Sequence, residues 1–327
     1  MNRSFSCWRV GSREPCQFVG SIAISLLLCV SVITGCASVS FPTVWQRMGT
    51  VITGTPTLEY SAQEPTVIID SGLFKMWYTC GWNIGNTCYA TSGDGIHWSA
   101  GTVLPDLAPL KHSFVFKNGS TYYFYGSDGT SYERFHSSDG LKWNFDRFGI
   151  LPVNGNGWES QYAGNIDVWI SNGTWYALHE AEGPKWTIGL ATSSDGLTWT
   201  EYAGNPVIGG SAKGGCSDPE MHRVGNTYAA WVHCGGLPTD IFLATSTDLH
   251  TWTIQHFGQL IRMTPDEGVA SPQGQVADPT LVEVGTSTYL YYSATNTQYP
   301  TSTDSIHIKL AVAPFTLTQL VSGKMTH

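Results

Sequence analysis

The sequence predicts an all-β fold, a five-bladed β-propeller of four-stranded antiparallel blades, which forms one domain over residues 37–327. Beyond Phe41, short runs rich in Val, Ile, Thr, Tyr and Trp are separated by Gly, Asn and Asp, which is typical of strands and hairpin turns. A seven-residue phrase recurs at intervals of about fifty residues, the size of a four-stranded blade. A tight turn followed by an aromatic strand occurs five times.

The recurring phrase is Ser-x-Asp-Gly-x-x-Trp, with copies at residues 92–98, 137–143 and 193–199 and a weaker copy at 246–252. We interpret it as structural. Asp and Gly form the turn, the small hydroxyl side chain satisfies backbone groups, and Trp packs between blades. The phrase therefore indicates the fold and says nothing about chemistry.

Five units follow from this pattern, and they begin near Glu64, Lys111, Asn165, Asp218 and Asp278. The fifth unit lacks the phrase. The segment from Val44 to Thr55 has the character of a spare outer strand, and we expect it to close the ring against the fifth blade.

The first 36 residues are predicted to lie outside the propeller. Arginines precede an uncharged apolar run from Phe18 to Thr34 that ends at Gly35-Cys36, which is typical of a signal peptide. Ile33-Thr34-Gly35-Cys36 resembles a bacterial lipobox, which implies lipidation of Cys36. An uncleaved membrane anchor is the alternative. We expect an exported protein of the bacterial cell envelope, either lipid-anchored or secreted.

Four cysteines remain beyond Cys36, and their spacing predicts two local disulfides. Cys80 and Cys88 flank one predicted hairpin turn, and Cys216 and Cys234 flank another. Hairpin pairing would bring each couple within bonding distance in an oxidising compartment. A metal site built from these four is poorly supported, because no pair has the C-x-x-C spacing.

The composition indicates which kinds of binding partner the protein is expected to have. Lys and Arg total 16 against 25 Asp and Glu, a formal net charge of −9, and there is no basic run to bind a phosphate backbone. We expect no nucleic-acid partner, contact with a membrane only through an N-terminal lipid anchor, and a monomer.

The predicted first strands all open with polar or ionisable residues, in the phrases Glu64-Pro65, His112-Ser113, Asn165-Ile166-Asp167, Asp218-Pro219-Glu220 and Asp278-Pro279. In a propeller these openings surround one end of the central channel, where functional side chains gather. Gathering carboxylates around one axis costs free energy that folding alone does not require. One protonated and one ionised carboxyl group are what glycosidic bond cleavage needs.

Together with Met76-Trp77-Tyr78-Thr79, these features resemble the arabinanase, invertase and levansucrase superfamily of five-bladed glycosidases, comprising families 43, 32, 62, 68, 117 and 130. The resemblance covers nearly all of residues 44–322. It implies Glu64 as base or nucleophile, Asp167 as the residue that orients or tunes it, and Asp218 or Glu220 as acid. The expected function is therefore hydrolysis of an oligo- or polysaccharide.

The chain also departs from the superfamily pattern. Its first blade carries Glu64 where Asp is usual, and Glu182-Gly183-Pro184 lies between second and third strands, so we treat its match to the family 43 acid phrase as accidental. The fructosidase phrases N-D-P-N-G and R-D-P are absent, which argues against sucrose and fructan substrates.

Further residues are candidates for substrate binding because they open strands or lie on loops at the same end of the channel. They are His112, Trp82, Trp158, Glu159, Gln161, His179, His233 and Asp278, with Trp186 and Tyr299 as further aromatic platforms. We predict no cofactor and no catalytic metal, although a structural calcium ion in the central channel is compatible with the sequence. The alternatives are a non-catalytic carbohydrate-binding lipoprotein, a protein-interaction scaffold and, least favoured because Arg is scarce, a sialidase.

Overall fold

The computed structural model describes residues 45–324, except for residues 82, 84, 156, 210–213, 236–238, 256–273 and 296–304. The predicted signal peptide and Cys36 lie outside the described residues, as do Trp82 and Tyr299. Within the described part of the chain, no helix is long and apolar enough to cross a membrane.

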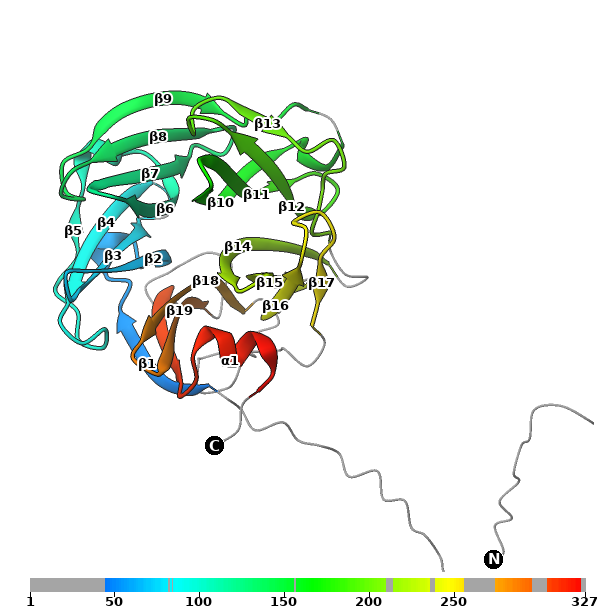
Figure 1. Cartoon of the computed structure of the whole chain (residues 1–327). Helices are drawn as coiled ribbons and strands as arrows, with labels where there is room; N and C mark the ends of the chain where they lie inside the picture. The colour runs from blue at the N-terminus through cyan, green and yellow to red at the C-terminus, as the bar shows by residue number, and fades with distance from the viewer. Residues whose placement is uncertain are drawn as a thin grey trace, which may run out of the picture. The chain divides into compact units, whose positions relative to one another are not determined.

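The described strands form five four-stranded antiparallel sheets arranged around one axis (Figure 1). Blade 1 contains β2 (Ala62–Asp70), β3 (Leu73–Cys80), β4 (Asn86–Ser92) and β5 (Thr102–Val103). Blade 2 contains β6 (Lys111–Asn118), β7 (Thr121–Ser127), β8 (Tyr132–Ser137) and β9 (Asn144–Ile150). Blade 3 contains β10 (Tyr162–Ser171), β11 (Thr174–Glu182), β12 (Trp186–Ser193) and β13 (Trp199–Glu201).

Blade 4 contains β14 (Gly215–Val224), β15 (Thr227–Gly235), β16 (Asp240–Ser246) and β17 (Thr253–Ile254). Blade 5 contains β18 (Gln275–Val284), β19 (Ser287–Thr295), β20 (His307–Ala313) and, as its outer strand, β1 (Gln46–Ile52). β1 pairs antiparallel with β20, so the first described strand closes the ring against the last blade. The predicted fold class and the predicted closing strand are both confirmed.

Short helical segments connect or end the blades. Three 3-10 turns span Pro56–Leu58, Pro105–Leu107 and Gly157–Glu159, and helix α1 (Leu317–Ser322) follows β20. Thr316 and Gln319 form a reciprocal capping box at the start of α1, which satisfies backbone N–H groups that the helix leaves free.

The Ser-x-Asp-Gly-x-x-Trp turns are held by the side chains that define the phrase. In the first copy, Ser92 Oγ accepts a hydrogen bond from Gly95 N at 2.9 Å, and Asp94 Oδ1 accepts from Ile96 N and His97 N at 2.8 Å. The other three copies repeat this geometry. The structural interpretation of the phrase thus agrees with its contacts.

These turns also fasten neighbouring blades together. Trp77 Nε1 on β3 donates to Gly140 O of the next blade at 2.9 Å, and Tyr125 Oη on β7 donates to Gly196 O at 2.7 Å. Tyr291 Oη on β19 donates to Gly95 O at 2.8 Å across the closure. His179 and Trp231 occupy the same register in blades 3 and 4, but their ring nitrogens Nε2 and Nε1 are buried without a hydrogen-bond partner among the described residues.

Every first strand has a register irregularity two residues long near its start. Glu64, His112, Asp218 and Asp278 lie in these bulges with φ between 51° and 56°, a left-handed conformation that non-glycine residues rarely adopt. The bulges turn these four side chains away from the regular alternation of the strand. They therefore determine which residues reach the channel.

Candidate active site

The candidate site is a cavity of about 640 Å³ at the end of the channel where the first strands begin and the second strands end. Its polar lining includes Gln63, Glu64, Lys111, His112, Tyr162, Asn165, Glu180, Glu182, Ser217, Asp218, His233, Thr239, Gln275 and Asp278, with Trp186 as its aromatic member beside Tyr162. A much smaller cavity of about 30 Å³ lies against the same bulges and is lined also by Pro65, Glu220 and Pro279.

Five side chains, one from each blade, form what we call the axial ring: Glu64, His112, Glu180, Asp218 and Asp278. Each links its blade to the next. His112 N donates to Glu64 Oε2 at 2.9 Å, Asp278 N donates to Asp218 Oδ2 at 3.3 Å, and Glu64 N donates to Asp278 Oδ2 at 3.3 Å. Asp218 N donates to Glu180 Oε2 at 2.6 Å, and His112 Nε2 lies 3.0 Å from Tyr162 Oη of blade 3. These contacts connect all five blades in a closed ring, with Tyr162 and Glu180 as the two contacts of blade 3.

The third member of the axial ring comes from a second strand. In the other blades the bulge residue of the first strand supplies the side chain, but the corresponding residue of β10 is Gly164. Glu180 of β11 fills the space, and its carboxyl group lies where a Cβ atom on residue 164 would be. Glu180 is only 3% exposed.

Two carboxyl groups of the axial ring are held ionised by histidines. Burial would raise the pKa of Glu64, but His112, whose Nδ1 lies 3.0 Å from Glu64 Oε1, outweighs it, and the pKa falls below its usual value. Burial likewise opposes ionisation of Asp218. Its ion pair with His233 Nδ1 and its hydrogen bonds with other carboxyl groups reverse the effect and lower the pKa of Asp218.

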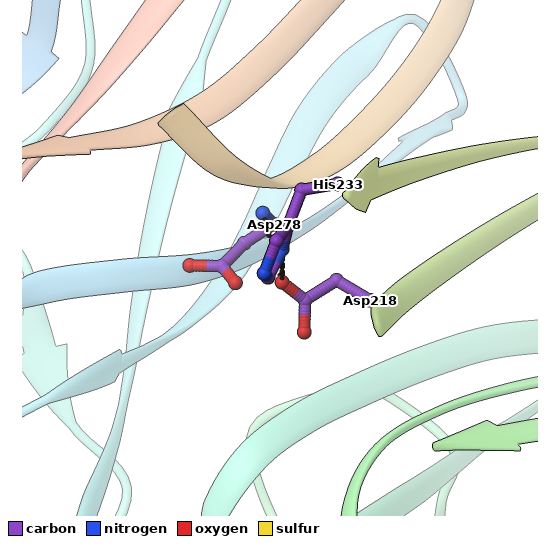
Figure 2. Close-up of side chains that lie close together, drawn as sticks. All are labelled: Asp218, His233 and Asp278. Atoms are coloured by element: carbon purple, nitrogen blue, oxygen red, sulfur yellow. Dashed lines mark hydrogen bonds and ion pairs between the residues drawn. The ribbon is translucent and has the colours of Figure 1, made fainter. Parts of the chain in front are cut away.

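The pKa values of the other two carboxyl groups are raised. Burial and the charge of Asp218, together with that of Glu64, raise the pKa of Asp278 well above its usual value. Burial and the adjacent Asp218 do the same to the pKa of Glu180. Carboxyl groups with lowered and with raised pKa values therefore lie side by side around one axis. Figure 2 shows Asp218, His233 and Asp278 converging on one point.

Each histidine in the site bridges an ionised carboxylate and a hydroxyl group. His112 lies between Glu64 and Tyr162, and His233 lies between Asp218 and Ser217, whose Oγ is 3.0 Å from His233 Nε2. Ser217 and His233 are direct partners across β14 and β15. Two carboxylate–imidazole–hydroxyl chains thus line the cavity.

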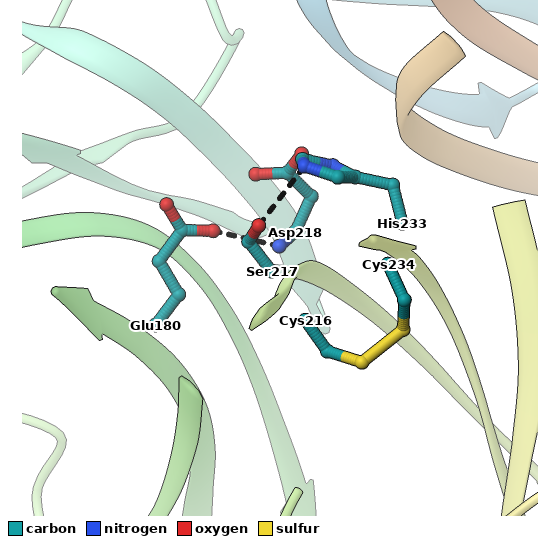
Figure 3. The surroundings of a disulfide bond; sticks show 6 residues. All are labelled: Glu180, Cys216, Ser217, Asp218, His233 and Cys234. Carbon is teal, nitrogen blue, oxygen red and sulfur yellow. Dashed lines mark hydrogen bonds and ion pairs between the residues drawn. A yellow bond between two sulfur atoms is a disulfide. The ribbon is translucent and has the colours of Figure 1, made fainter. Parts of the chain in front are cut away.

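A disulfide lies directly beside the second of these chains (Figure 3). Cys216 and Cys234 are paired across the same two strands, one position away from Ser217 and His233. The second disulfide joins Cys80 and Cys88 in blade 1. Both predicted pairings are confirmed, and disulfides are typical of proteins that fold outside the reducing cytoplasm.

Several residues predicted from the sequence line the larger cavity: Glu64, His112, Asp218, His233 and Asp278. Glu220 lines the smaller cavity instead, and its Oε1 accepts a hydrogen bond from Leu281 N of blade 5 at 3.2 Å. Asp167 lines neither cavity. It is buried between blades, where its Oδ2 accepts from Met221 N at 2.5 Å.

The remaining candidates cluster around the entry to blade 3, outside the cavity lining. His179 is 2% exposed and its ring lies against that of Trp158, with ring centroids 5.3 Å apart. Burial lowers the pKa of His179 to about 3. Burial and the neighbouring Glu201 carboxyl raise the pKa of Glu159 to about 8. Gln161 is exposed.

Glu180 and Tyr162 were not anticipated. Glu180 lies on a second strand, and only the glycine at position 164, where the other blades carry an ionisable residue, signals that another side chain fills that place. Tyr162 lies at the very start of β10 and carries no motif.

Among the described residues, three side chains lie close enough together to hold a metal ion. Ligand atoms of Asp218, His233 and Asp278 lie within 4.8 Å of one another. One imidazole and two carboxylates suit a transition metal better than calcium, which prefers six to eight oxygen ligands. Asp278 would have to lose its proton to take part.

No protein-family model and no curated protein matches the chain. Several solved structures do match the fold of the chain. Its fold is similar to that of a structure described as a glycoside hydrolase, with TM-score 0.65 and 17% identity over 82% of this chain and 91% of that one. A thermostable family-43 glycoside hydrolase has TM-score 0.59 and 13% identity over 76% of this chain and 89% of that one. An endo-1,4-beta-xylanase from Bacteroides thetaiotaomicron has TM-score 0.57 and 13% identity over 81% and 91%. The chain therefore has the five-bladed propeller fold of these glycoside hydrolases.

Proposed function

We propose that the protein hydrolyses glycosidic bonds of a carbohydrate bound in the cavity at the propeller axis. The observation that carries the proposal is the pairing of an ionised Glu64 with a protonated Asp278 on neighbouring first strands of one cavity. Neighbouring carboxyl groups whose environments drive their pKa values apart supply the acid and the base of this reaction.

In this proposal Asp278 donates the proton to the leaving oxygen. It is the most exposed carboxyl group of the axial ring, and ionised Asp218 and Glu64 flank it. The sequence favoured Asp218 or Glu220 as the acid. We assign the role to Asp278 because the pKa of Asp218 is lowered and because Glu220 lines only the smaller cavity.

Glu64 is the base or nucleophile in this proposal, as the sequence resemblance implies. Its two oxygens contact His112 Nδ1, His112 N and Gln63 Nε2, which fix the orientation of the carboxylate. In this proposal, Asp218 and Glu180 determine whether Asp278 keeps its proton. Asp167 and Glu220 join blades.

The proposed place of action is the bacterial cell envelope. The two disulfides support folding in an oxidising compartment. The apolar N-terminal run ending in Gly35-Cys36 supports export with a lipid anchor on Cys36, and the protein would act there as a monomer.

The test compares glycosides that differ only in the leaving group. Asp278→Asn should lower kcat by about 10²- to 10⁴-fold for unactivated oligosaccharides, which need protonation. It should have little effect on dinitrophenyl glycosides, whose leaving group departs unprotonated. Glu64→Gln should abolish turnover of both. Asp94→Asn, in an exposed turn, is the control.

Equal loss by Asp278→Asn on both kinds of substrate would remove Asp278 from the acid role. Full activity of both site variants would refute the assignment altogether.

A second candidate function, carbohydrate binding without hydrolysis, has an observation of its own. The carboxyl groups of the axial ring accept N–H groups of the next blade, so folding would retain them without catalysis. Glycoside binding by the wild-type protein with no turnover of dinitrophenyl glycosides would favour it.

A further inference from the structure

The end of blade 3 presents three side chains in one row to the cavity. Tyr162 of β10 pairs with Glu182 of β11, and Glu182 pairs with Trp186 of β12, so the three share one register position. All three line the cavity. The rings of Tyr162 and Trp186 meet edge to face, with centroids 5.9 Å apart.

The hydroxyl group of Tyr162 is oriented by the axial ring. His112 Nδ1 is ion-paired with Glu64, and His112 Nε2 lies 3.0 Å from Tyr162 Oη. A histidine that carries both protons donates through Nε2, so the tyrosine oxygen accepts and its own proton must point elsewhere. Among the described residues, Tyr162 Oη has no other hydrogen-bond partner, and it faces the cavity.

The phenol group also keeps its proton. Burial, followed by the charge of Glu64, raises the pKa of Tyr162 above its usual value. Tyr162 can therefore donate a hydrogen bond to a group bound in the cavity.

We propose that Tyr162, Glu182 and Trp186 form a subsite for one neutral sugar ring. Tyr162 donates to a sugar oxygen, Glu182 accepts from a sugar hydroxyl, and the Trp186 indole packs against the apolar face of the ring. The ionised Glu64 and the carboxyl group of Glu182 disfavour an anionic sugar. This inference deepens the proposed function and uses the same cavity.

The subsite depends on pH through His112. Burial would lower the pKa of His112, but the Glu64 carboxylate, aided by Asp218 and opposed by Lys111, raises it above the ordinary 6.5. The bound state requires protonated His112, so affinity is full below that raised pKa and falls as pH increases through it. Neutral His112 accepts through Nε2, and Tyr162 then turns its proton toward the histidine.

The experiment measures binding in the Asp278→Asn background, where turnover does not obscure it. Isothermal titration would use methyl glycosides of neutral pentoses and hexoses, with a methyl glucuronoside for comparison. Tyr162→Phe should weaken binding of the best neutral glycoside by about 5- to 30-fold, the loss expected when one hydrogen bond inside a cavity is removed. Tyr202→Phe, on the exposed outer side of the same blade, should change nothing.

A structural role for Tyr162 would not produce the pH signature. His112→Gln should remove the fall of affinity at high pH, and Tyr162→Phe should remove it too. Thermal unfolding should show that both variants are folded at the temperature of the binding measurement.

Three results would overturn the subsite: no binding of any neutral glycoside at the solubility limit, equal binding by Tyr162→Phe, or tighter binding of the glucuronoside. Failure of hydrolysis alone would not, because retained, Tyr162-dependent binding without turnover contradicts only the proposed function.

Discussion

The carboxyl group of Glu180 occupies the space that a side chain on Gly164 would fill. Blade 3 thereby supplies its member of the axial ring from the second strand, and the glycine is required by close approach. We predict that Gly164→Ala destabilises the protein by about 1–3 kcal/mol, because overpacking forces neighbours to shift. Urea unfolding measures this. The added methyl group of Gly164→Ala should also displace the Glu180 carboxyl group from Asp218 N.

Gly93→Ala is the matched control, since a Cβ at position 93 meets nothing within 4 Å. Equal unfolding free energies for the two variants would contradict the account of Gly164.

The second prediction compares two tryptophans in the same register of different blades. Trp77 and Trp231 are both fully buried, but Trp77 Nε1 donates to Gly140 O whereas Trp231 Nε1 has no partner among the described residues. Trp77→Phe should therefore lower the free energy of unfolding by about 1–3 kcal/mol more than Trp231→Phe does, because it leaves the buried Gly140 carbonyl without its hydrogen-bond donor. Thermal and urea unfolding of the pair would check this, and the reverse order would show that ring packing dominates.

The third prediction concerns the protonation of Asp278. Its folded-state pKa is raised well above the ordinary 3.8, so the folded protein retains a proton that the unfolded chain releases. Stability from this group is present below pH 3.8 and is lost as pH rises toward the folded pKa. The Asp278→Asn variant has no such loss of stability with rising pH, because its amide does not titrate and can still donate a hydrogen bond to Asp218. We expect the variant to be the more stable protein at neutral pH.

The measurement is urea unfolding of wild type and Asp278→Asn at acidic and neutral pH. The difference should shrink toward acid, and a pH-independent difference would show that Asp278 is ionised in the folded state.

The fold was predictable because its signals are local and repeated. Turn residues, aromatic strands and the Ser-x-Asp-Gly-x-x-Trp phrase each report on a few neighbouring residues, and five copies in series determine a ring. The disulfides followed from hairpin symmetry for the same reason. Glu64, Asp218 and Asp278 were found because bulge residues at strand starts meet at the axis.

The rest of the site depends on relations between blades that a single strand does not reveal. The bulge between Ala163 and Ile166 places Asp167 one position away from the channel face, and Glu180 of β11 supplies the member of the axial ring that comes from blade 3. Tyr162 acquires its role only through His112, fifty residues away in the sequence.

The Cys216–Cys234 bond joins the two strands that hold Ser217 and His233 in the wall of the cavity. A chain whose thiols remain reduced would lack this covalent link between the two strands. Reduction of the bond is therefore expected to loosen the part of the cavity wall that holds Ser217 and His233.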